Sequence, residues 1–337
     1  MNEKKLRWGC LGAGVILDRF LPGAFQDESA EFVAVASRTR ETAEKMAAKW
    51  RIPRTMTYEE MLASPEIDAV YIPVPHPFHR ELAARAAEAG KHILVEKPAC
   101  VSAEEWRQLS ALAREKGVFL MEAVWTRFFP AIAFVKEQLA KGMIGAVRAV
   151  QSSFAFRIEE RGRLTEPEMA GGSLLDVGVY DLHFARMILD KDPVQLKGVA
   201  GFDTDGLHLK VDEHAAITAL YDRGEIAVMT CAVRTRMPDT AYIYGETGYF
   251  ELPHFWSADT VKLVKGDRME TFSFPVPQKD PARPDEGYQF EFRHANECIR
   301  KGLTESPVLP HSVTESILTQ CDSLRRDWGE VYPFEKK

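Results

Sequence analysis

Two short segments of the chain carry groups that could move a proton. Glu96-Lys97-Pro98 follows the apolar run His92–Val95, and further along the chain Asp176 and Tyr180 stand four residues apart. Four-residue spacing puts two side chains on one face of a helix. A lysine, a carboxylate and a phenol suit the oxidation of an alcohol, because a base must take the hydroxyl proton as hydride leaves the carbon.

Tyr180 is the candidate base, and Lys97 would make it effective. A free tyrosine has a pKa of about 10 and is a poor base at neutral pH. A nearby ammonium stabilises the phenolate and lowers that pKa, and it also orients the alcohol oxygen. Asp176 would hold substrate hydroxyls or orient Lys97. The structural alternative is a carboxylate at a helix N-terminus beside a core tyrosine, which the Glu96-Lys97-Pro98 segment makes the weaker explanation.

Two local features indicate how the backbone presents these groups. Pro98 follows Lys97 directly, which suggests a constrained, cis peptide that directs the ammonium into a cleft. Gly178 lies between Asp176 and Tyr180, where it costs about 1 kcal/mol relative to alanine in a helix interior. A glycine there indicates that something else approaches the helix backbone closely.

Residues 1–123 predict an α/β domain with a doubly wound parallel sheet. Short apolar runs alternate there with segments of helical periodicity. The expected strands are Leu6–Leu11, Phe32–Ala36, Ala69–Ile72, His92–Val95 and Val118–Met121, and the expected helices include Glu41–Trp50, Tyr58–Ala63, Phe78–Ala89 and Ala103–Lys116. Such sheets bind ligands at the carboxyl ends of their strands, which is where Lys97 stands.

The first expected strand runs into Gly12-x-Gly14, which predicts a dinucleotide site. Gly12 permits a tight turn, and Gly14 lets the backbone reach a pyrophosphate. Val15 and Ile16 open a helix whose N-terminus attracts the anion. Leu17 stands where a third small residue is usual, which weakens the pattern. The alternative is a glycine-rich turn without a ligand.

The end of the second strand indicates which cofactor is preferred. An NAD site usually has Asp or Glu there, whereas this strand runs into Ser37 and Arg38, with Arg40 close behind. These side chains could donate to a 2′-phosphate, a charge-assisted contact worth roughly 1.5–3 kcal/mol. We therefore expect NADP, with NAD as the alternative cofactor. The alternative for Arg38 is a solvated surface arginine.

Beyond residue 123 the pattern becomes that of an α+β domain with a large open antiparallel sheet, so we expect two domains, 1–123 and 124–337. Gly, Asp and Pro turns separate the short strands as in hairpins. The expected strands are Val147–Phe156, Val194–Phe202, Ala215–Tyr221, Ile226–Val233, Thr240–Tyr244, Tyr249–Leu252, Thr260–Val264 and Glu270–Phe274, with helices at Ala131–Lys141, from Ser173, at Glu286–Lys301 and at Val313–Asp327. The few helices cannot cover both faces of this sheet, which predicts a homodimer or higher oligomer joined sheet to sheet.

Composition excludes several classes of protein. With 43 basic and 50 acidic residues the net charge is −7, and the two signs are interspersed, so a nucleic-acid partner is not expected. No run of about 18 apolar residues predicts a membrane span. The five cysteines are scattered without a C-x-x-C pair, which argues against a zinc site or a disulfide framework. The N-terminus has no apolar signal region, so we expect a cytoplasmic protein.

Gly12-x-Gly14, Glu96-Lys97-Pro98 and Asp176-x-Gly178-x-Tyr180, in this order, resemble the Gfo/Idh/MocA family of sugar and polyol oxidoreductases. Two longer strings, Met121–Pro130 and Glu305–Val308, resemble most closely its dimeric dihydrodiol dehydrogenase and NADP-linked D-xylose dehydrogenase branch. The resemblance implies a Rossmann domain, an open sheet that often forms the dimer face, and a nicotinamide over the lysine. Many members have His where this chain has Tyr180, and the tyrosine is shared with that branch.

The resemblance also implies roles for further residues. It puts Trp125 and Phe154 near nicotinamide and substrate, where they would form apolar walls; the alternative is that both fill the interdomain core. It makes Pro73, His76, His79, Glu96 and Arg127 candidates for cofactor contact. An interdomain ion pair is the alternative for Arg127. The spacing of His76 and His79 invites a metal site, which we discount because no carboxylate or thiol stands nearby at ligand spacing.

Together these observations predict an NADP-dependent enzyme that moves hydride between nicotinamide and a secondary alcohol or carbonyl of a sugar, cyclic polyol or trans-dihydrodiol. One alternative is a glycosidase or lyase that oxidises its substrate transiently and keeps the cofactor bound. Another is a non-catalytic sugar- or dinucleotide-sensing protein. Lys97 and Tyr180 argue against a sensor, which needs neither acid nor base.

Overall fold

The computed structural model describes residues 4–158, 162–202, 210–277 and 286–335. The chain divides into two compact units. The first comprises Met1–Cys100, Glu104–Trp125 and Val276–Glu315, and the second comprises Val101–Ala103, Thr126–Pro275 and Ser316–Lys337. The described residues 276–277 and 286–315, which lie far beyond the expected boundary at 123, therefore pack with the first unit.

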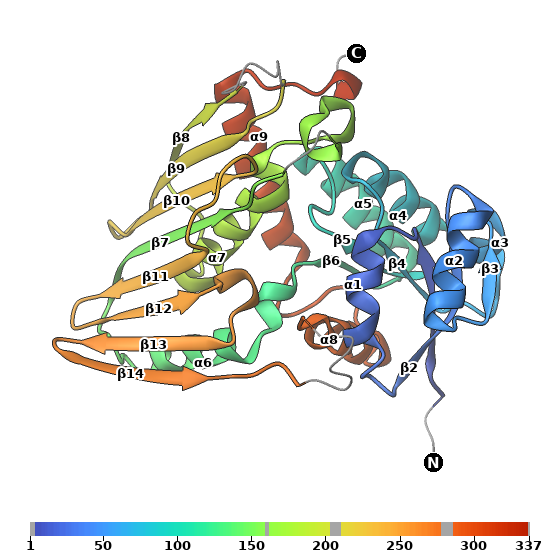
Figure 1. The fold of residues 1–337 in the computed structure, drawn as a ribbon, viewed down its shortest axis with the longest axis horizontal. Coiled ribbons are helices and arrows are strands. Elements are labelled where there is room, and N and C mark those ends of the chain that lie inside the picture. The colour runs from blue at the N-terminus through green and yellow to red at the C-terminus, as the bar shows by residue number, and fades with distance from the viewer. Residues whose placement is uncertain (1–3, 159–161, 203–209, 278–285, 336–337) are drawn as a thin grey trace. The chain divides into compact units, whose positions relative to one another are not determined.

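The first unit contains a six-stranded parallel sheet of order β3-β2-β1-β4-β5-β6, as expected for a Rossmann fold (Figure 1). The strand order reverses between β1 and β4, which is where open α/β sheets bind ligands. The strands are β1 (Leu6–Leu11), β2 (Ala30–Ala36), β3 (Arg54–Met56), β4 (Ala69–Ile72), β5 (His92–Glu96) and β6 (Leu120–Ala123). The helices are α1 (Val15–Ala24), α2 (Arg40–Trp50), α3 (Tyr58–Ala63), α4 (His79–Glu88), α5 (Ala103–Lys116) and α8 (Tyr288–Arg300).

Helix α8 belongs to this unit because its buried face completes the core beside α1. Phe292 stacks on Phe32 and meets Phe20 edge to face, with ring centroids 5.3 Å and 5.6 Å apart. Asn296 accepts a hydrogen bond from Trp8 Nε1 at 2.8 Å and donates to Asp27 Oδ2 at 2.9 Å. These buried polar groups satisfy one another and fix α8 against the beginning of the chain.

The second unit contains an eight-stranded sheet of order β14-β13-β12-β11-β7-β10-β9-β8. Neighbouring strands are antiparallel except β7 and β10, which are parallel, so the expected antiparallel sheet is in fact mixed at this pair. The strands are β7 (Val147–Ala155), β8 (Gln195–Gly201), β9 (His214–Leu220), β10 (Ile226–Ala232), β11 (Thr240–Gly245), β12 (Tyr249–Pro253), β13 (Thr260–Lys265) and β14 (Arg268–Ser273).

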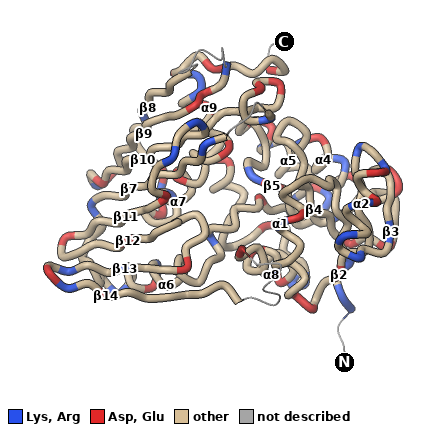
Figure 2. The backbone as a smooth tube through the Cα atoms, viewed as in Figure 1, with Lys and Arg blue, Asp and Glu red and all other residues tan. Residues whose placement is uncertain are grey.

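Helices α6 (Pro130–Ala140) and α7 (Val179–Leu189) and most of α9 (His311–Trp328) belong to the second unit. Helix α7 packs on β7 and β10, and α6 on β13. Burial alternates strictly along β9, as a sheet with one covered face requires. Among the described residues, none of the helices has the length and apolar character that a bilayer-spanning segment requires. Figure 2 shows basic and acidic residues interspersed along both units.

Candidate functional site

The turn between β1 and α1 is built around Gly12. Its backbone has a φ of +131°, and a Cβ atom there would lie 2.9 Å from Val74 Cγ1 and 3.0 Å from Pro73 O. Its N–H donates to Ala36 O at 2.9 Å, which ties the turn to the end of β2. Only glycine suits this conformation and this space, so the tight turn predicted from the sequence is confirmed.

Helix α1 begins with an open N-terminus. Gly14 is its N-cap residue, and within the described part of the chain no side chain caps the first N–H groups. Val15 is 80% exposed, and Ile16 is partly exposed. Backbone donors left open at a helix N-terminus suit an anion such as a pyrophosphate. Leu17, at the position where a small residue is usual, is fully buried and leaves the start of the helix open.

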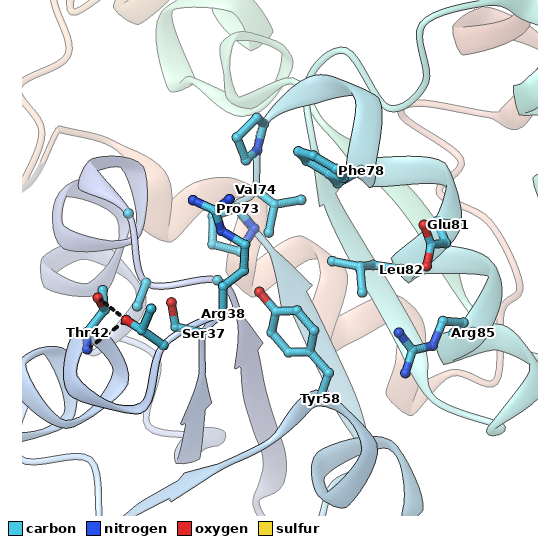
Figure 3. Close-up of a pocket in the computed structure, with 15 residues that line it drawn as sticks. Ser37, Arg38, Thr42, Tyr58, Pro73, Val74, Phe78, Glu81, Leu82 and Arg85 are labelled. Carbon is cyan, nitrogen blue, oxygen red and sulfur yellow. Dashed lines mark hydrogen bonds between the residues drawn. The ribbon is translucent and has the colours of Figure 1, made fainter. Parts of the chain in front are cut away.

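The Gly12 turn borders a pocket of about 410 Å³ at the carboxyl ends of β1, β2 and β4 (Figure 3). It lies at the reversal of strand order and within one unit. Its lining comprises Gly12, Ala13, Gly14, Ser37, Arg38, Thr39, Thr42, Tyr58, Pro73, Val74, Pro75, Phe78, Glu81, Leu82 and Arg85. A second pocket shares Ser37, Arg38 and Tyr58 with the first and extends past Arg40 along the segment 55–60.

Arg38 is an exposed cation of this pocket, and Figure 3 shows it and Tyr58 projecting into the same space. Burial raises the pKa of Tyr58, while the Arg38 charge acts to lower it. Arg40 forms an ion pair with Glu44 one helical turn away, with its Nε 2.8 Å from Glu44 Oε1. Tyr58 was not among the predicted site residues. It was expected only as the start of the helix Tyr58–Ala63, and no local pattern related it to the pocket.

Lys97 stands partly exposed at the end of β5, and its bond to Pro98 is cis, as expected. The buried carboxylate of Glu96 holds this position. Glu96 Oε1 accepts from Tyr71 Oη at 2.5 Å, and Glu96 Oε2 accepts from the Lys97 N–H at 3.2 Å. A carboxylate that accepts on both oxygens fits the ionised form. Burial raises the pKa of Tyr71 well above its usual value, which keeps that phenol a donor.

A second buried carboxylate, which the sequence did not reveal, fixes the segment after Pro98. Glu122 in β6 accepts from the Ala99 N–H at 3.0 Å and from Thr314 Oγ1 at 2.8 Å. Both oxygens are thus used to hold protein groups. The Lys97 segment is therefore supported from β4 through Tyr71 and from β6 through Glu122.

His79 links two loops of the first unit. Its Nδ1 lies 2.7 Å from Pro98 O and its Nε2 lies 2.6 Å from Val74 O. His76 is buried beside it, with ring centroids 5.9 Å apart. Within the described ranges, no three His, Cys, Asp or Glu side chains come together as metal ligands would. His79 therefore positions the segments that carry Val74 and Lys97.

Trp125 is buried in the first unit, where its ring stacks on Tyr288 with centroids 4.2 Å apart. Tyr288 lies at the start of α8, and burial raises its pKa well above the usual value. Sequence reasoning missed Tyr288, because no local pattern relates it to Trp125.

In the second unit, Phe154 and Tyr180 are brought together. Their ring centroids lie 5.3 Å apart at an interplanar angle of 69°. Phe154 also stacks on Trp256, with centroids 5.0 Å apart. Sequence reasoning missed Trp256, which reaches the site from beyond β12. The three aromatic side chains form one cluster on the helix-covered side of the sheet.

Asp176 lies in a π-helical segment, Leu174–Gly178, that continues into α7 and Tyr180. The expected helix is present, with this wider first turn. Asp176 Oδ1 accepts from Arg163 Nη2 at 2.9 Å. A Cβ at Gly178 would lie 2.9 Å from Cys231 Sγ, so the close approach that this glycine predicted is made by β10. π-Helical turns occur frequently at functional sites.

Arg127 and His183 lie together in the second unit. Arg127 Nε lies 3.4 Å and Nη2 lies 3.3 Å from His183 Nδ1. A guanidinium can only donate, so this nitrogen is the acceptor and carries no proton. Arg127 thus contacts a residue of its own unit. The contact with His183 is neither the cofactor contact nor the interdomain ion pair that the sequence suggested for Arg127.

Comparison with known proteins agrees with the motifs and the fold. Residues 6–124 match the Gfo/Idh/MocA oxidoreductase family with an NAD-binding Rossmann fold, and residues 132–251 match the C-terminal domain of the same family. The chain belongs to the Gfo/Idh/MocA family. Its Rossmann domain is thus of the NAD(P)-binding kind, and the protein is an oxidoreductase.

Relatives in this family act on diols and sugars. The chain is 36% identical to a trans-1,2-dihydrobenzene-1,2-diol dehydrogenase of Mus musculus, with 98% of this chain and 99% of that protein covered. Its structure is similar to an aldose-aldose oxidoreductase of Caulobacter crescentus, with a TM-score of 0.85, 25% identity, and 96% and 97% of the two chains covered. A 3-ketoreductase of Actinomadura kijaniata, in complex with TDP-benzene and NADP, gives a TM-score of 0.80, 26% identity, and coverage of 96% and 97%.

Proposed function

We propose that this protein transfers hydride between NADP and a secondary alcohol or carbonyl of a sugar, cyclic polyol or trans-dihydrodiol. The observation that carries the proposal is the pocket at the Gly12 turn, which opens at the strand-order reversal of the sheet and has Arg38 exposed in its lining. The diol dehydrogenase and sugar oxidoreductase relatives support the substrate class.

The cofactor fits the residues that are present. A Cβ at Gly12 would collide with Val74 and Pro73 in the turn, so only glycine leaves this space open. The start of α1 offers backbone N–H donors that no described side chain caps. NADP would be held by Gly12, Gly14, Val15, Ile16, Ser37, Arg38, Arg40, Pro73 and Lys97. The other residues expected at the cofactor are buried and would act by holding the segments that carry them; these are His76, His79, Glu96, Trp125 and Arg127. When bound, its nicotinamide supplies the hydride acceptor or donor.

The preference for NADP rests on charge at the end of β2. Ser37 and Arg38 follow that strand, and no carboxylate stands there to bind a ribose 2′-hydroxyl. The Arg38 guanidinium is exposed in the pocket, where a 2′-phosphate would gain roughly 1.5–3 kcal/mol from it. Arg40 would contribute less, because Glu44 already engages it.

Tyr180 takes the hydroxyl proton in the proposed reaction, and Lys97 holds the reacting oxygen and stabilises the phenolate. Two other buried tyrosines are poor candidates for the base, because burial raises the pKa of Tyr71 and of Tyr288 well above the usual value. Asp176 would bind substrate hydroxyls, and its contact with Arg163 orients its carboxyl group. Trp125 and Phe154 would present apolar rings to the C–H face of the substrate.

We also propose a homodimer joined through the open face of the second unit's sheet. Strand register puts Val199, Leu220, Ile226 and Val228 on this face, where all four are exposed. Tyr242, Tyr244 and Tyr249 cluster on the same face. Contiguous exposed apolar and aromatic residues are typical of an interface.

A cytoplasmic location completes the proposal. All five cysteines of the chain are buried free thiols. Proteins of oxidising compartments more often pair their cysteines, so a reducing compartment suits this chain.

The test is a panel of sugars, cyclic polyols and trans-dihydrodiols assayed with NADP and NAD at the absorbance band of the reduced nicotinamide. Net reduction of NADP by at least one panel member is expected. Tightly retained cofactor with bond cleavage and no net reduction would instead indicate transient oxidation. Binding of a sugar or of NADP without any turnover would indicate a sensor.

A further inference from the structure

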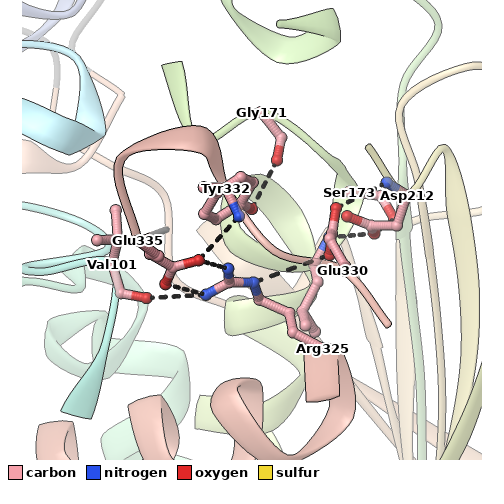
Figure 4. A network of polar contacts seen from close by, with 9 residues as sticks. Val101, Gly171, Ser173, Asp212, Arg325, Glu330, Tyr332 and Glu335 are labelled. Carbon is pink, nitrogen blue, oxygen red and sulfur yellow. Dashed lines mark hydrogen bonds and ion pairs between the residues drawn. The ribbon is translucent and has the colours of Figure 1, made fainter. Parts of the chain in front are cut away.

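The start of the segment that carries Asp176 is fastened by a buried carboxylate, Asp212 (Figure 4). Asp212 is fully buried, and its Oδ2 accepts from Ser173 Oγ at 2.5 Å and from the Leu174 N–H at 2.7 Å. The Ser173 N–H donates to Asp212 O at 2.8 Å. Three hydrogen bonds thus join Asp212 to the start of the π-helical segment. The first N–H groups of a helix have no carbonyl partners within the helix, so Asp212 supplies acceptors for them.

Gly172 makes room for this carboxylate. Its backbone has a φ of +110°, and a Cβ there would overlap Asp212 Oδ1. Gly171 is equally constrained, since a Cβ on it would lie 2.6 Å from Leu164 O. Gly172 is therefore required because it lets Asp212 reach the start of the helix, and Gly171 is required because the chain passes close to the Leu164 backbone.

The C-terminal segment 325–335 holds Asp212 and Gly171 from the other side. Glu330 Oε1 accepts from the Asp212 N–H at 3.1 Å, and Tyr332 Oη donates to Gly171 O at 2.9 Å. Arg325 secures this segment. Its guanidinium lies over the Tyr332 ring, 3.9 Å from the centroid, and its Nη1 donates to Glu335 Oε1 at 3.1 Å.

Burial sets the protonation of the two carboxyl groups in this network. Burial and the neighbouring Glu330 raise the pKa of Asp212 well above its usual value, and burial raises the pKa of Glu330 to about 7. Both carboxyl groups therefore keep a proton to higher pH than solvated carboxyl groups do, and the Arg325 guanidinium lies beside Glu330. A protonated Asp212 still accepts both helix-start hydrogen bonds on Oδ2, because an acid retains acceptor capacity.

We propose that Asp212 is a positioning residue for the catalytic segment: it fixes the start of the π-helical turn and thereby the orientation of Asp176 and Tyr180. The C-terminal segment acts through Asp212 and Gly171. The consequence for turnover rests on the proposed function of Tyr180. The fastening, by which we mean the hydrogen bonds that Asp212 accepts from Ser173 and Leu174, does not depend on that function.

The experiment compares Asp212→Ala with Asp212→Asn and Ser173→Ala in the full-length protein. Asparagine keeps a carbonyl oxygen for both helix-start donors, alanine removes it, and Ser173→Ala removes one donor and is the milder variant should Asp212→Ala fold poorly. Glu225→Gln is the matched control, because it breaks a partly buried pair with Lys191 in the same unit, in the turn between β9 and β10.

Two readouts are needed. Hydrogen exchange of residues 173–182 should speed up at least about tenfold in Asp212→Ala, less in Ser173→Ala, and little in Asp212→Asn or Glu225→Gln. On a substrate found with the panel above, kcat should fall by about 10- to 100-fold in Asp212→Ala, with NADP affinity unchanged, because small misplacements of a reacting group cost this much. Asp212→Asn should recover most of the loss.

Unchanged exchange in 173–182 for Asp212→Ala would overturn the fastening, and faster exchange with unchanged kcat would overturn the positioning role. If kcat fell as much in Glu225→Gln as in Asp212→Ala, general destabilisation would explain the loss. That result would also overturn the positioning role of Asp212. If the wild-type protein turned over no panel member, while exchange changed as expected, the proposed function alone would fall and the fastening would stand.

Discussion

The indole of Trp125 lies against the phenol of Tyr288, with ring planes inclined by only 19° and centroids 4.2 Å apart. Trp125 ends the Rossmann half of the chain, and Tyr288 opens α8, which returns to the same unit after the whole second sheet. The aromatic wall predicted at Trp125 thus depends on a residue supplied from near the C-terminus.

The first prediction tests this support. Tyr288→Leu should lower kcat/KM for the alcohol substrate by about 2- to 10-fold, because a stacked aromatic pair is worth roughly 0.5–1.5 kcal/mol beyond its buried area. Tyr288→Phe keeps the ring and should behave as wild type. Steady-state kinetics at saturating NADP measure both. Equal losses in the two variants would show that the hydroxyl, and not the stacked ring, matters.

The second prediction concerns cofactor choice. Arg38→Ala should raise the KM for NADP relative to that for NAD by about 10- to 150-fold, the equivalent of roughly 1.5–3 kcal/mol. Arg40→Ala is the comparison, and its effect should be smaller because Glu44 engages Arg40. An unchanged ratio of the two KM values in Arg38→Ala would reject the assignment of the 2′-phosphate contact to this residue.

The features that could be predicted from the sequence are those that a short window of residues encodes. Gly12, the cis bond at Pro98, and most strands of both sheets follow from backbone requirements and periodicity of this local kind. Gly178 indicated a close approach, but its partner, Cys231, comes from a distant strand. Short polar β3 gave no apolar pattern, so it was missed, as was its neighbour Tyr58.

Contacts between distant segments account for the remaining differences. The parallel pairing of β7 with β10 depends on how the chain crosses the sheet, which hairpin patterns do not specify. Asp212 carries no motif, and its contact with Ser173 exists only because the fold brings the residues just before β9 beside the π-helical turn. Patterns in sequence thus located the candidate reactive groups better than the residues that hold them.

The third prediction concerns stability and pH. Burial raises the pKa of Glu330 to about 7. Among the described residues, Arg325 and Glu335 are the charged groups that act on it, and the Asp212 N–H donates to it. Between the ordinary glutamate pKa and pH 7 the folded state keeps a proton that the unfolded chain releases. The free energy of unfolding should therefore decrease as pH rises through this interval, and level off above it.

Urea unfolding at pH 5 and pH 8 measures this decrease. Glu330→Gln should remove roughly 3 kcal/mol of it at most, because each pKa unit corresponds to 1.36 kcal/mol. Glu225→Gln is the control, because the pKa of Glu225 is shifted in the opposite direction. Lys191 lowers that pKa, so the contribution of the Glu225 carboxylate to the free energy of unfolding is lost only at acid pH, outside this interval. Identical pH dependence in wild type and Glu330→Gln would contradict the prediction.

The fourth prediction tests assembly. Light scattering at micromolar concentration should give at least twice the 38.0 kDa of one chain. Ile226→Glu with Val228→Glu puts two charges on the open face of the sheet and should yield monomers, because desolvating an unpaired charge at an interface is costly. Val308→Glu, an equally exposed apolar position in the first unit, should leave the assembly intact. A wild-type mass of one chain would reject the dimer.

The last prediction separates proton transfer from positioning. Tyr180→Phe keeps the ring against Phe154 and deletes the proton acceptor, so kcat should fall by about 10²- to 10⁴-fold, the usual contribution of a general base. Lys97→Met removes charge and orientation together and should cost at least as much. NADP affinity, followed by fluorescence titration, should remain close to that of the wild type in Tyr180→Phe.

The pH profile decides which group is the base. For the wild type, kcat/KM for oxidation should rise with pH, because the base must be ionised to accept the proton, and Tyr180→Phe should lose that rise. If Tyr180→Phe kept both its rate and its profile, another group would take the proton. Lys97 would then be the first candidate, since it stands at a strand end of the Rossmann sheet. Asp176, whose Oδ1 accepts from Arg163, and His183, whose Nδ1 accepts from Arg127, would follow in that order.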